Sequence, residues 1–298
     1  MTDTATFVDS DGVEIFYRHW APDGPPRASV VVAHGASEHS GRYSRFAGAL
    51  TAAGFAVFAP DHRGHGRTSE STGVGLAGAH GFDGIVADVR QLVDVAAETA
   101  TPVLLFGHSM GSIIALRYAE QHPQTIAALA LSGSLGVMAG AEQMRADLQQ
   151  AVDAGMADQP MDALGPFNEP FEPARTPFDW LSRDDAEVDK YLTDPYCGTN
   201  HLLTYGYMAQ MVQCLLDGIA DLDALPSTLP VLLASGGRDP VSNGATAVRE
   251  LADRLRAAGI EDFSEAYYAH ARHEILNETN REEVTADLVA WLERAAPR

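Results

Sequence analysis

The sequence predicts an α/β fold: a mostly parallel, doubly wound sheet with helices on both faces and an inserted helical cap. Strand-like and helix-like segments alternate through most of the 298 residues, which is the pattern of repeated βα units. The alternation stops between residues 135 and 225, where no clear buried strand is recognised and prolines are frequent. A chain with 46% hydrophobic residues is apolar enough for one large domain with such an insertion.

The segments before residue 135 follow the period expected of each element. Residues 13–20 alternate in polarity after the Asp11-Gly12 turn, which predicts one half of an early hairpin. Continuous apolar runs, typical of strands covered on both faces, are found at residues 28–34, 55–61, 102–107 and 126–132. Helical patterns predict helices over residues 42–53, 83–98 and 110–121, the first of them ending at Gly54.

After residue 225 the alternation resumes. Residues 230–236 are a predicted buried strand, and residues 262–269 are a weaker one. Helices are predicted over residues 244–258, ending at Gly259, and over residues 280–296. The predicted domain organisation is a core of residues 1–134 and 226–298, with residues 135–225 as a cap, or lid, over the carboxyl ends of the strands.

The predicted cap is rich in methionine. It holds six of the eight methionines of the chain, at positions Met138, Met144, Met156, Met161, Met208 and Met211. Methionine-rich surfaces adapt to apolar ligands of varied shape, so Met138, Met208 and Met211 are candidate substrate contacts. The alternative is that these side chains fill the core of the cap itself.

Charge limits the partners of this chain. With 41 acidic and 20 basic side chains the net charge is 20 − 41 = −21. Such a surface repels phosphate backbones, so we expect no nucleic-acid partner. No apolar run reaches the roughly 18 residues of a membrane-spanning helix, so no integral membrane segment is expected.

Compartment and redox state are also predicted. The stretch "MTDTATFVDSDG" lacks the basic and apolar regions of a signal peptide, which indicates the cytoplasm. Cys197 and Cys214 have no metal-like spacing. We expect two free thiols, with a disulfide as the alternative.

The motif Gly107-His108-Ser109-Met110-Gly111 stands where a predicted strand meets a predicted helix. In this context G-x-S-x-G forms a nucleophile elbow, whose tight turn requires glycine at both ends. The Ser109 hydroxyl would project above the sheet, and the Met110 N–H would face a developing oxyanion. A serine that merely caps the helix is the alternative, but it does not explain the paired glycines.

A serine nucleophile needs a base and an acid that orients the base. Asp239 follows the strand at 230–236, and two histidines, His270 and His273, follow the strand at 262–269. Both are placed to act as the base, and the pattern alone does not separate them. The loop after residues 28–34 offers the Ala36 N–H as a second oxyanion donor. His62 and His65 are expected in a hydrogen-bonded turn, and no metal or cofactor is predicted.

Five stretches, "HGASEHSGRY", "DHRGHGRTS", "GHSMG", "GGRDPV" and "RHEILNE", occur in the order seen in monoacylglycerol lipase and lysophospholipase-like serine hydrolases of the α/β-hydrolase superfamily. The chain resembles this family over nearly its whole length. The resemblance implies an α/β-hydrolase fold with Ser109 as nucleophile, Asp239 as acid and His273 as base, and with Ala36 and Met110 as oxyanion donors. Two residues depart from the family pattern, Ser112 and His270, and both are candidate substrate contacts.

The expected function is a serine carboxylic ester hydrolase that forms an acyl-enzyme on Ser109. Its expected substrate is a small neutral apolar monoester such as a monoacylglycerol, and its cap is expected to touch a lipid surface transiently. The enzymatic alternatives are a lysophospholipase, a thioesterase and a hydrolase of xenobiotic monoesters such as monoalkyl phthalates. A ligand-binding protein that keeps the fold without catalysis is an alternative from another class. The oligomeric state is left open.

Overall fold

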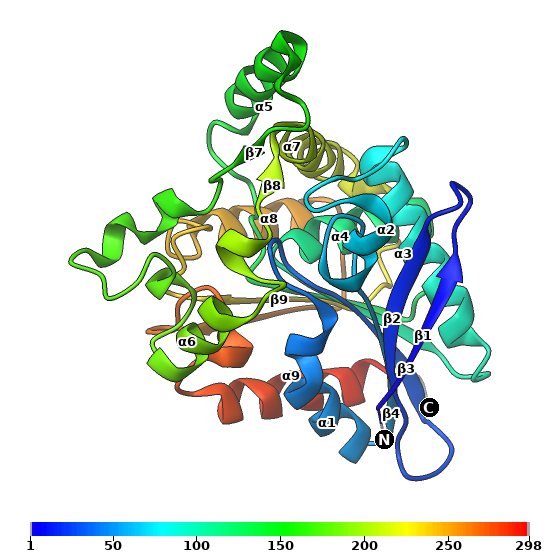
Figure 1. The fold of residues 1–298 in the computed structure, drawn as a ribbon. Helices are drawn as coiled ribbons and strands as arrows, with labels where there is room; N and C mark the ends of the chain where they lie inside the picture. The colour runs from blue at the N-terminus through cyan, green and yellow to red at the C-terminus, as the bar shows by residue number, and fades with distance from the viewer. Residues whose placement is uncertain (1, 297–298) are drawn as a thin grey trace.

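The computed structural model, which describes residues 2–296, confirms the predicted α/β fold (Figure 1). One sheet of eight strands has the order β1-β2-β4-β3-β5-β6-β9-β10. Its strands are β1 (Thr2–Val8), β2 (Glu14–Trp20), β3 (Ala28–Ala33), β4 (Phe55–Pro60), β5 (Val103–His108), β6 (Ala128–Ser132), β9 (Val231–Gly236) and β10 (Phe263–Tyr268). Strand β2 pairs antiparallel with β1, as predicted for an early hairpin, and it also pairs antiparallel with β4. The remaining neighbours in this sheet, in the order β4, β3, β5, β6, β9 and β10, are parallel.

Helices cover both faces of the sheet. They are α1 (Ser44–Ala52), α3 (Gly81–Ala97), α4 (Met110–Gln121), α8 (Thr246–Ala257) and α9 (Arg281–Ala295). The short helix α2 (Ser69–Thr72) packs instead on the 3₁₀ turn that precedes it. Alternate residues of β3 show why both faces are covered: Val31 belongs to the buried cluster that contains side chains of α3 and α4, whereas Val30 and Val32 belong to the cluster that contains side chains of α1 and α9. Because successive side chains of a strand point to opposite faces, a continuous apolar run needs a helical layer on each side.

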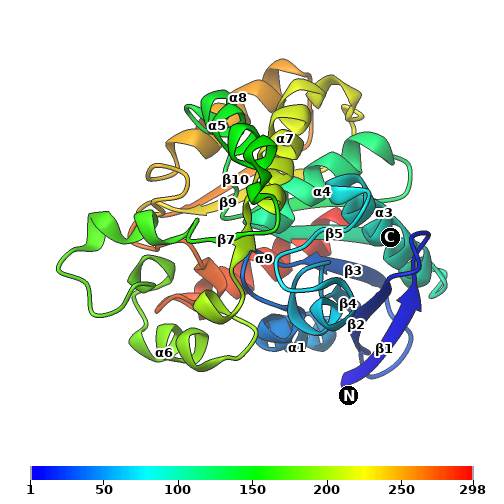
Figure 2. The ribbon, with the colours of Figure 1, turned by 45° about the horizontal axis from the view of Figure 1, so that its top comes forward.

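The chain between β6 and β9 contains the predicted cap. Its elements are α5 (Ala141–Ala151), β7 (Pro160–Met161), α6 (Asp185–Thr193), β8 (Leu203–Thr204) and α7 (Tyr205–Ala220). Helices α5 and α7 pack side by side, and α7 also packs on α4 of the core (Figure 2). Strand β8 is buried and pairs with β7 through two residues only, which is too short to give a recognisable apolar run.

Element boundaries differ from the predictions by a few residues. Helix α1 begins at Ser44 because Ser40–Tyr43 form a 3₁₀ turn, η1. Strand β10 is only half-buried, as expected from its weaker pattern, because it lies at the edge of the sheet. Within residues 2–296, no helix has both the length and the apolar character that crossing a bilayer requires.

Candidate active site

Ser109 occupies a strained turn between β5 and α4. Its φ of 52° and ψ of −121° lie in a region that residues other than glycine rarely adopt. A Cβ on Gly107 would overlap the carbonyl of Gly111, and a Cβ on Gly111 would overlap the carbonyl of Ala33. The Ser109 side chain makes no capping hydrogen bond to α4. The geometry is therefore that of a nucleophile elbow rather than of a helix cap.

Asp239 and His273 meet beyond the ends of β9 and β10. Asp239 Oδ2 lies 3.0 Å from His273 Nδ1, and both side chains are buried. The other carboxylate oxygen accepts the N–H of Val241 at 2.9 Å. With Nδ1–H donating to Asp239, His273 Nε2 is left free to accept a proton. Burial alone would lower the pKa of His273, but the carboxylate of Asp239, together with those of Glu274 and Glu38, more than offsets this, so its pKa lies above the ordinary value of 6.5.

Two aromatic rings flank His273. The ring of Trp180 lies 5.0 Å away between centroids, and that of His108 lies 4.9 Å away. Burial, followed by the nearby His273, lowers the pKa of His108 to about 4, so this ring is neutral at pH 7. Within residues 2–296 no hydrogen bond joins Ser109 to His273. Such bonds often tighten only when substrate is bound.

The Gly35-Ala36 peptide is held at its carbonyl. Gly35 O accepts a hydrogen bond from His34 Nδ1 at 2.7 Å, and His34 Nε2 accepts the N–H of His62 at 2.9 Å. Because Nε2 is an acceptor, Nδ1 must carry the proton. The N–H of a trans peptide points opposite to its carbonyl, so the Ala36 N–H faces away from His34. Among residues 2–296, the N–H groups of Ala36 and Met110 have no acceptor.

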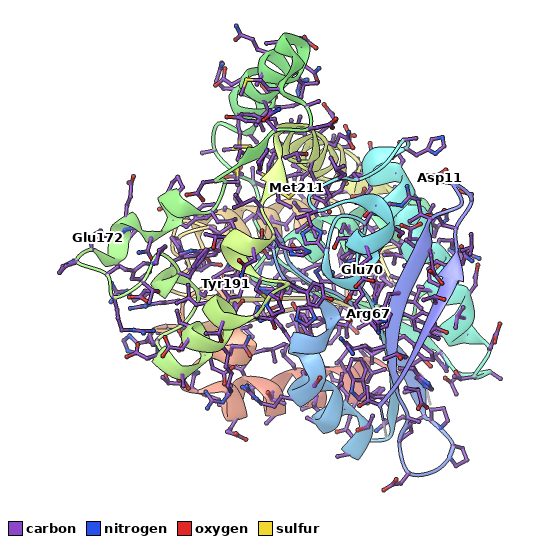
Figure 3. The ribbon with its side chains drawn as sticks, in the orientation of Figure 1. Asp11, Arg67, Glu70, Glu172, Tyr191 and Met211 are labelled. Atoms are coloured by element: carbon purple, nitrogen blue, oxygen red, sulfur yellow. The ribbon has the colours of Figure 1, made fainter. Side chains whose placement is uncertain are left out.

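An apolar cavity contains Ser109, Ala36 and Met110 in its wall. Three of the methionines singled out in the sequence, Met138, Met208 and Met211, also line it (Figure 3 locates Met211 on α7). The remaining lining residues are Leu135, Met144, Ala163, Leu164, Phe167, Trp180, Leu203, Val212 and Val241. Met144 and Trp180 were not predicted as contacts, although the position of Met144 in the methionine-rich segment was a signal for it.

Two predicted substrate contacts, Ser112 and His270, are not among the residues that line this cavity. The Ser112 hydroxyl donates to the carbonyl of Ser109 at 2.6 Å within α4. His270 lies in an exposed turn after β10, with its ring in solvent. Three residues further on, the backbone N–H of His273 bonds to the carbonyl of Trp180. The chain has then turned inward, so His273 and not His270 meets Asp239.

One group of potential metal ligands is present in residues 2–296, formed by His39, Asp194 and Cys197. His39 Nδ1 accepts the N–H of Gly41 at 3.2 Å, so the ring proton is on Nε2, which lies 3.0 Å from Asp194 Oδ2. A metal would need that nitrogen unprotonated, and the arrangement is that of a histidine–carboxylate hydrogen bond. Cys197 and Cys214 are both free and buried, as predicted.

Comparisons with known proteins agree with this geometry. A family model described as "Serine aminopeptidase, S33" matches residues 24–280. The monoglyceride lipase of Homo sapiens is 35% identical over 283 residues, which cover 93% of this chain and 86% of that protein. The monoacylglycerol lipase of Mycolicibacterium smegmatis is 31% identical over 296 residues, covering 96% of this chain and 95% of the relative. A solved structure of a thermostable carboxyl esterase from Bacillus coagulans matches with a TM-score of 0.91 and 28% identity, over 99% of this chain and 98% of that one.

Proposed function

We propose that this chain, which belongs to the serine aminopeptidase S33 family, hydrolyses monoacylglycerols. Its membership confirms the resemblance to monoacylglycerol lipases of the α/β-hydrolase superfamily and makes the chain a serine ester hydrolase. One observation carries the choice of substrate class. The strained Ser109 lies in the wall of a cavity whose other lining side chains are apolar, and such a cavity suits the acyl chain of a neutral ester.

The proposed reaction assigns one step to each group. Ser109 Oγ forms a bond to the ester carbonyl carbon while its proton passes to His273 Nε2. The carbonyl oxygen becomes an oxyanion, which accepts hydrogen bonds from the N–H groups of Ala36 and Met110. The bond to the glycerol oxygen then breaks, and that oxygen takes the proton from His273.

Water completes the proposed cycle. It attacks the acyl-enzyme while His273 accepts a proton from it, and the fatty acid leaves as Ser109 recovers its hydroxyl proton. Asp239 keeps the imidazole in the tautomer that presents Nε2 and stabilises the imidazolium. The chemistry of these steps is carried by side chains and backbone N–H groups of this chain.

Two of the alternative ester substrates stay candidates, and one is not favoured. A lysophospholipid carries a charged phosphate, but no arginine, lysine or histidine side chain lines the described cavity. The relatives at 31% and 35% identity are named for monoacylglycerols, which likewise disfavours a lysophospholipase. Thioesters and monoalkyl phthalates present a similar acyl carbonyl, so they belong in the same test.

We also propose a location for this activity. Two buried free thiols suit the reducing cytoplasm. Transient contact with a lipid surface is proposed for the segment between residues 135 and 225, where Met144 and Met156 are 40% and 37% exposed. Flotation with neutral vesicles, and cell fractionation, test these two points.

The first experiment measures kcat/KM on a panel of esters for wild type and for Ser109→Ala. The panel holds monoacylglycerols of increasing acyl length, a monoalkyl phthalate, an acyl thioester and a lysophospholipid. We expect the highest value on a monoacylglycerol and no turnover by Ser109→Ala. Equal activity in the variant would refute the role of Ser109, and inactivity of the wild type on every ester would favour the non-catalytic binding protein.

A further inference from the structure

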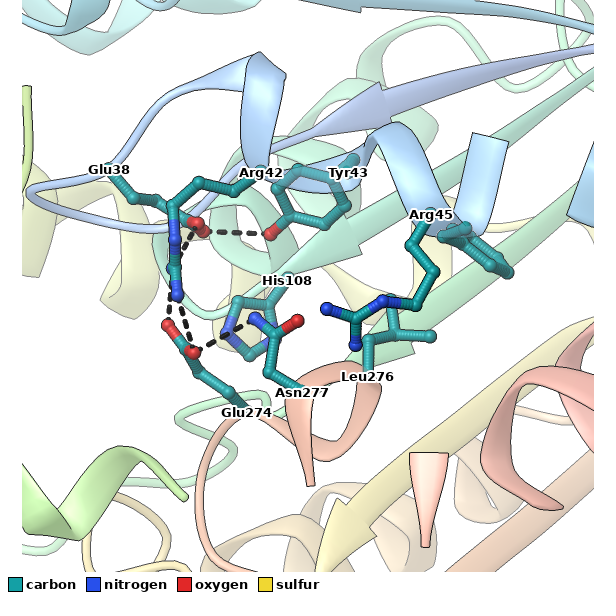
Figure 4. A pocket seen from close by; sticks show the side chains of 9 residues that line it. Glu38, Arg42, Tyr43, Arg45, His108, Glu274, Leu276 and Asn277 are labelled. Carbon is teal, nitrogen blue, oxygen red and sulfur yellow. Dashed lines mark hydrogen bonds and ion pairs between the residues drawn. The ribbon is translucent and has the colours of Figure 1, made fainter. Parts of the chain in front are cut away.

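A buried ion cluster, Glu38–Arg42–Glu274, lies behind the candidate site (Figure 4). Arg42 Nη1 bonds to Glu38 Oε2 at 2.7 Å, and its guanidinium also forms a two-pronged contact with Glu274, with Nη2 at 2.8 Å from Oε2. Glu38 and Glu274 are 3% and 5% exposed. Charges this deeply buried are retained only where partners satisfy them.

The Glu38 end of this cluster reaches the loop that carries a proposed oxyanion donor. Glu38 Oε1 accepts the N–H of Gly35 at 2.6 Å and the hydroxyl of Tyr43 at 2.7 Å. Gly35 directly precedes Ala36, and its carbonyl is held by His34. Both polar groups of Gly35 are therefore tied, the N–H through Glu38 and the carbonyl through His34.

The Glu274 end belongs to the loop that carries the proposed base. Glu274 directly follows His273, and its backbone N–H donates to the carbonyl of Leu181 at 2.8 Å. Its Oε2 also accepts a hydrogen bond from Asn277 Nδ2 at 3.0 Å. Every carboxylate oxygen in the cluster thus has a partner, and within residues 2–296 Arg42 is the one side chain that hydrogen-bonds to both ends.

We propose that Arg42 is a positioning residue that fixes the oxyanion loop at Gly35-Ala36 relative to the base loop at His273-Glu274. The inference rests on the proposed function, since it assigns Arg42 to the geometry of that same site. A guanidinium presents its donors in a rigid planar arrangement that matches two carboxylates at once, whereas an ammonium is a point charge. The two loops come from distant parts of the chain and carry groups that must act on one carbonyl, so their separation has to be held within fractions of an ångström.

The variant that tests this is Arg42→Lys, with Arg45→Lys as its matched control. Arg45 lines the same pocket, but it pairs with Glu187 and makes no hydrogen bond to either loop (Figure 4). For Arg42→Lys we expect kcat to fall about 100-fold, the cost of a displacement near 1 Å, while KM changes less than twofold. The melting temperature and circular dichroism are measured alongside. Unchanged kcat in Arg42→Lys, or an equal fall in Arg45→Lys, would overturn the proposal.

A double-mutant cycle separates positioning from packing. Glu38→Gln and Glu274→Gln each break one end of the connection, so we expect the double variant to lose scarcely more kcat than either single variant. Additive losses would mean that the two ends act independently, which overturns the proposal. A triple variant, Glu38→Gln, Arg42→Met, Glu274→Gln, removes every buried charge and is expected to fold with kcat still reduced. Recovery of wild-type kcat in that variant would also overturn it.

The rate at which a fluorophosphonate labels Ser109 gives a readout that does not depend on the natural substrate. It is expected to fall in Arg42→Lys as kcat does. If the wild type labels rapidly but hydrolyses no monoacylglycerol, the proposed substrate fails while the role of Arg42 can still be judged. If labelling is equal in both proteins, the role of Arg42 fails whatever the substrate is.

Discussion

Ser109 lies between two regions of opposite chemistry. On the core side, the loops at Gly35 and His273 are held by hydrogen bonds whose donors and acceptors are paired, through His34, Glu38 and Arg42. On the cap side, the wall of the cavity is formed by flexible apolar side chains, including four methionines. Hydrogen bonds fix direction and distance, whereas methionine repacks around different shapes. The polar side is therefore suited to hold the reacting groups in one geometry. The apolar side is suited to determine which acyl chains the cavity accepts.

The largest expected effect comes from replacing one group on the polar side. Asp239→Asn keeps the shape of the side chain but favours the wrong tautomer of His273, so kcat should fall by about 10⁴-fold. Steady-state kinetics on the best monoacylglycerol check this, with the melting temperature as the control for folding. A loss below tenfold would mean that His273 does not depend on Asp239 for its orientation.

A smaller effect is expected on the apolar side. In Met208→Leu, Met211→Leu the volume of the wall is kept, so stability should change by less than about 1.5 kcal/mol. Leucine has fewer rotamers, and the ratio of kcat/KM between long and short acyl chains should shift by roughly 3- to 10-fold. Met161→Leu, outside the cavity wall, is the control and should leave the ratio unchanged. A uniform loss of kcat on every chain length would contradict the division of roles.

The pH dependence of activity tests the hydrogen-bonded polar side of the site separately from the apolar side. The base must be neutral, and the pKa of His273 lies above 6.5 because the carboxylates of Asp239, Glu274 and Glu38 together outweigh the effect of burial. The acid limb of kcat/KM should therefore have its midpoint above pH 6.5, with activity lost as the pH falls through it. A midpoint below pH 6.5 would show that desolvation dominates and that the Asp239 interaction is weaker than its 3.0 Å geometry indicates.

The smallest effect concerns stability alone and compares two buried carboxylates. Burial opposes ionisation of Glu38, but Arg42, with His108, His34 and the Tyr43 hydroxyl, outweighs it and lowers the pKa to about 2, whereas burial raises the pKa of Glu120 in α4 to about 8. Within residues 2–296, Glu120 Oε1 has no hydrogen-bond partner, and Oε2 has only Arg117 at 3.2 Å. A pKa raised by folding means that stability is lost as the pH rises from 4.5 through 8.

Glu120→Gln removes that loss. At pH 9 the variant should be more stable than wild type by roughly 2 kcal/mol, because a neutral amide avoids the cost of burying an ionised carboxylate, and at pH 4 the two should be equal. Urea unfolding at both pH values measures the difference. If the wild type were more stable than Glu120→Gln at pH 9, the ion pair with Arg117 would compensate for the buried charge of Glu120.

The sequence predicted the parts of the site that depend on local pattern. Apolar runs located the central strands, and the glycines on either side of Ser109 identified its turn, since a Cβ at either position would meet backbone. His270 and His273 could not be separated from the residues alone, because both follow the same strand. The positions of the two side chains depend on the path of the turn, which leaves His270 in solvent and directs His273 toward Asp239.

The Glu38–Arg42–Glu274 cluster could not be predicted for a different reason. Arg42 and Glu274 are 232 residues apart in the chain, so their pairing appears only when β3 and β10 are placed in one sheet. The pairing of β7 with β8 was missed because two residues carry no periodicity. Long-range polar contacts and very short strands share this property: local residue preferences do not encode them.

The ring of Tyr191 on α6 lies 4.8 Å beneath the Arg42 guanidinium (Figure 3 labels this tyrosine). Trp180 and Leu181 bind the backbone of His273 and Glu274 from the same stretch of chain. Lids of related enzymes are attractive units to exchange when a new substrate is wanted. In this chain a transplanted lid would have to bring its own equivalents of Tyr191, Trp180 and Leu181, because half of it is part of the catalytic framework.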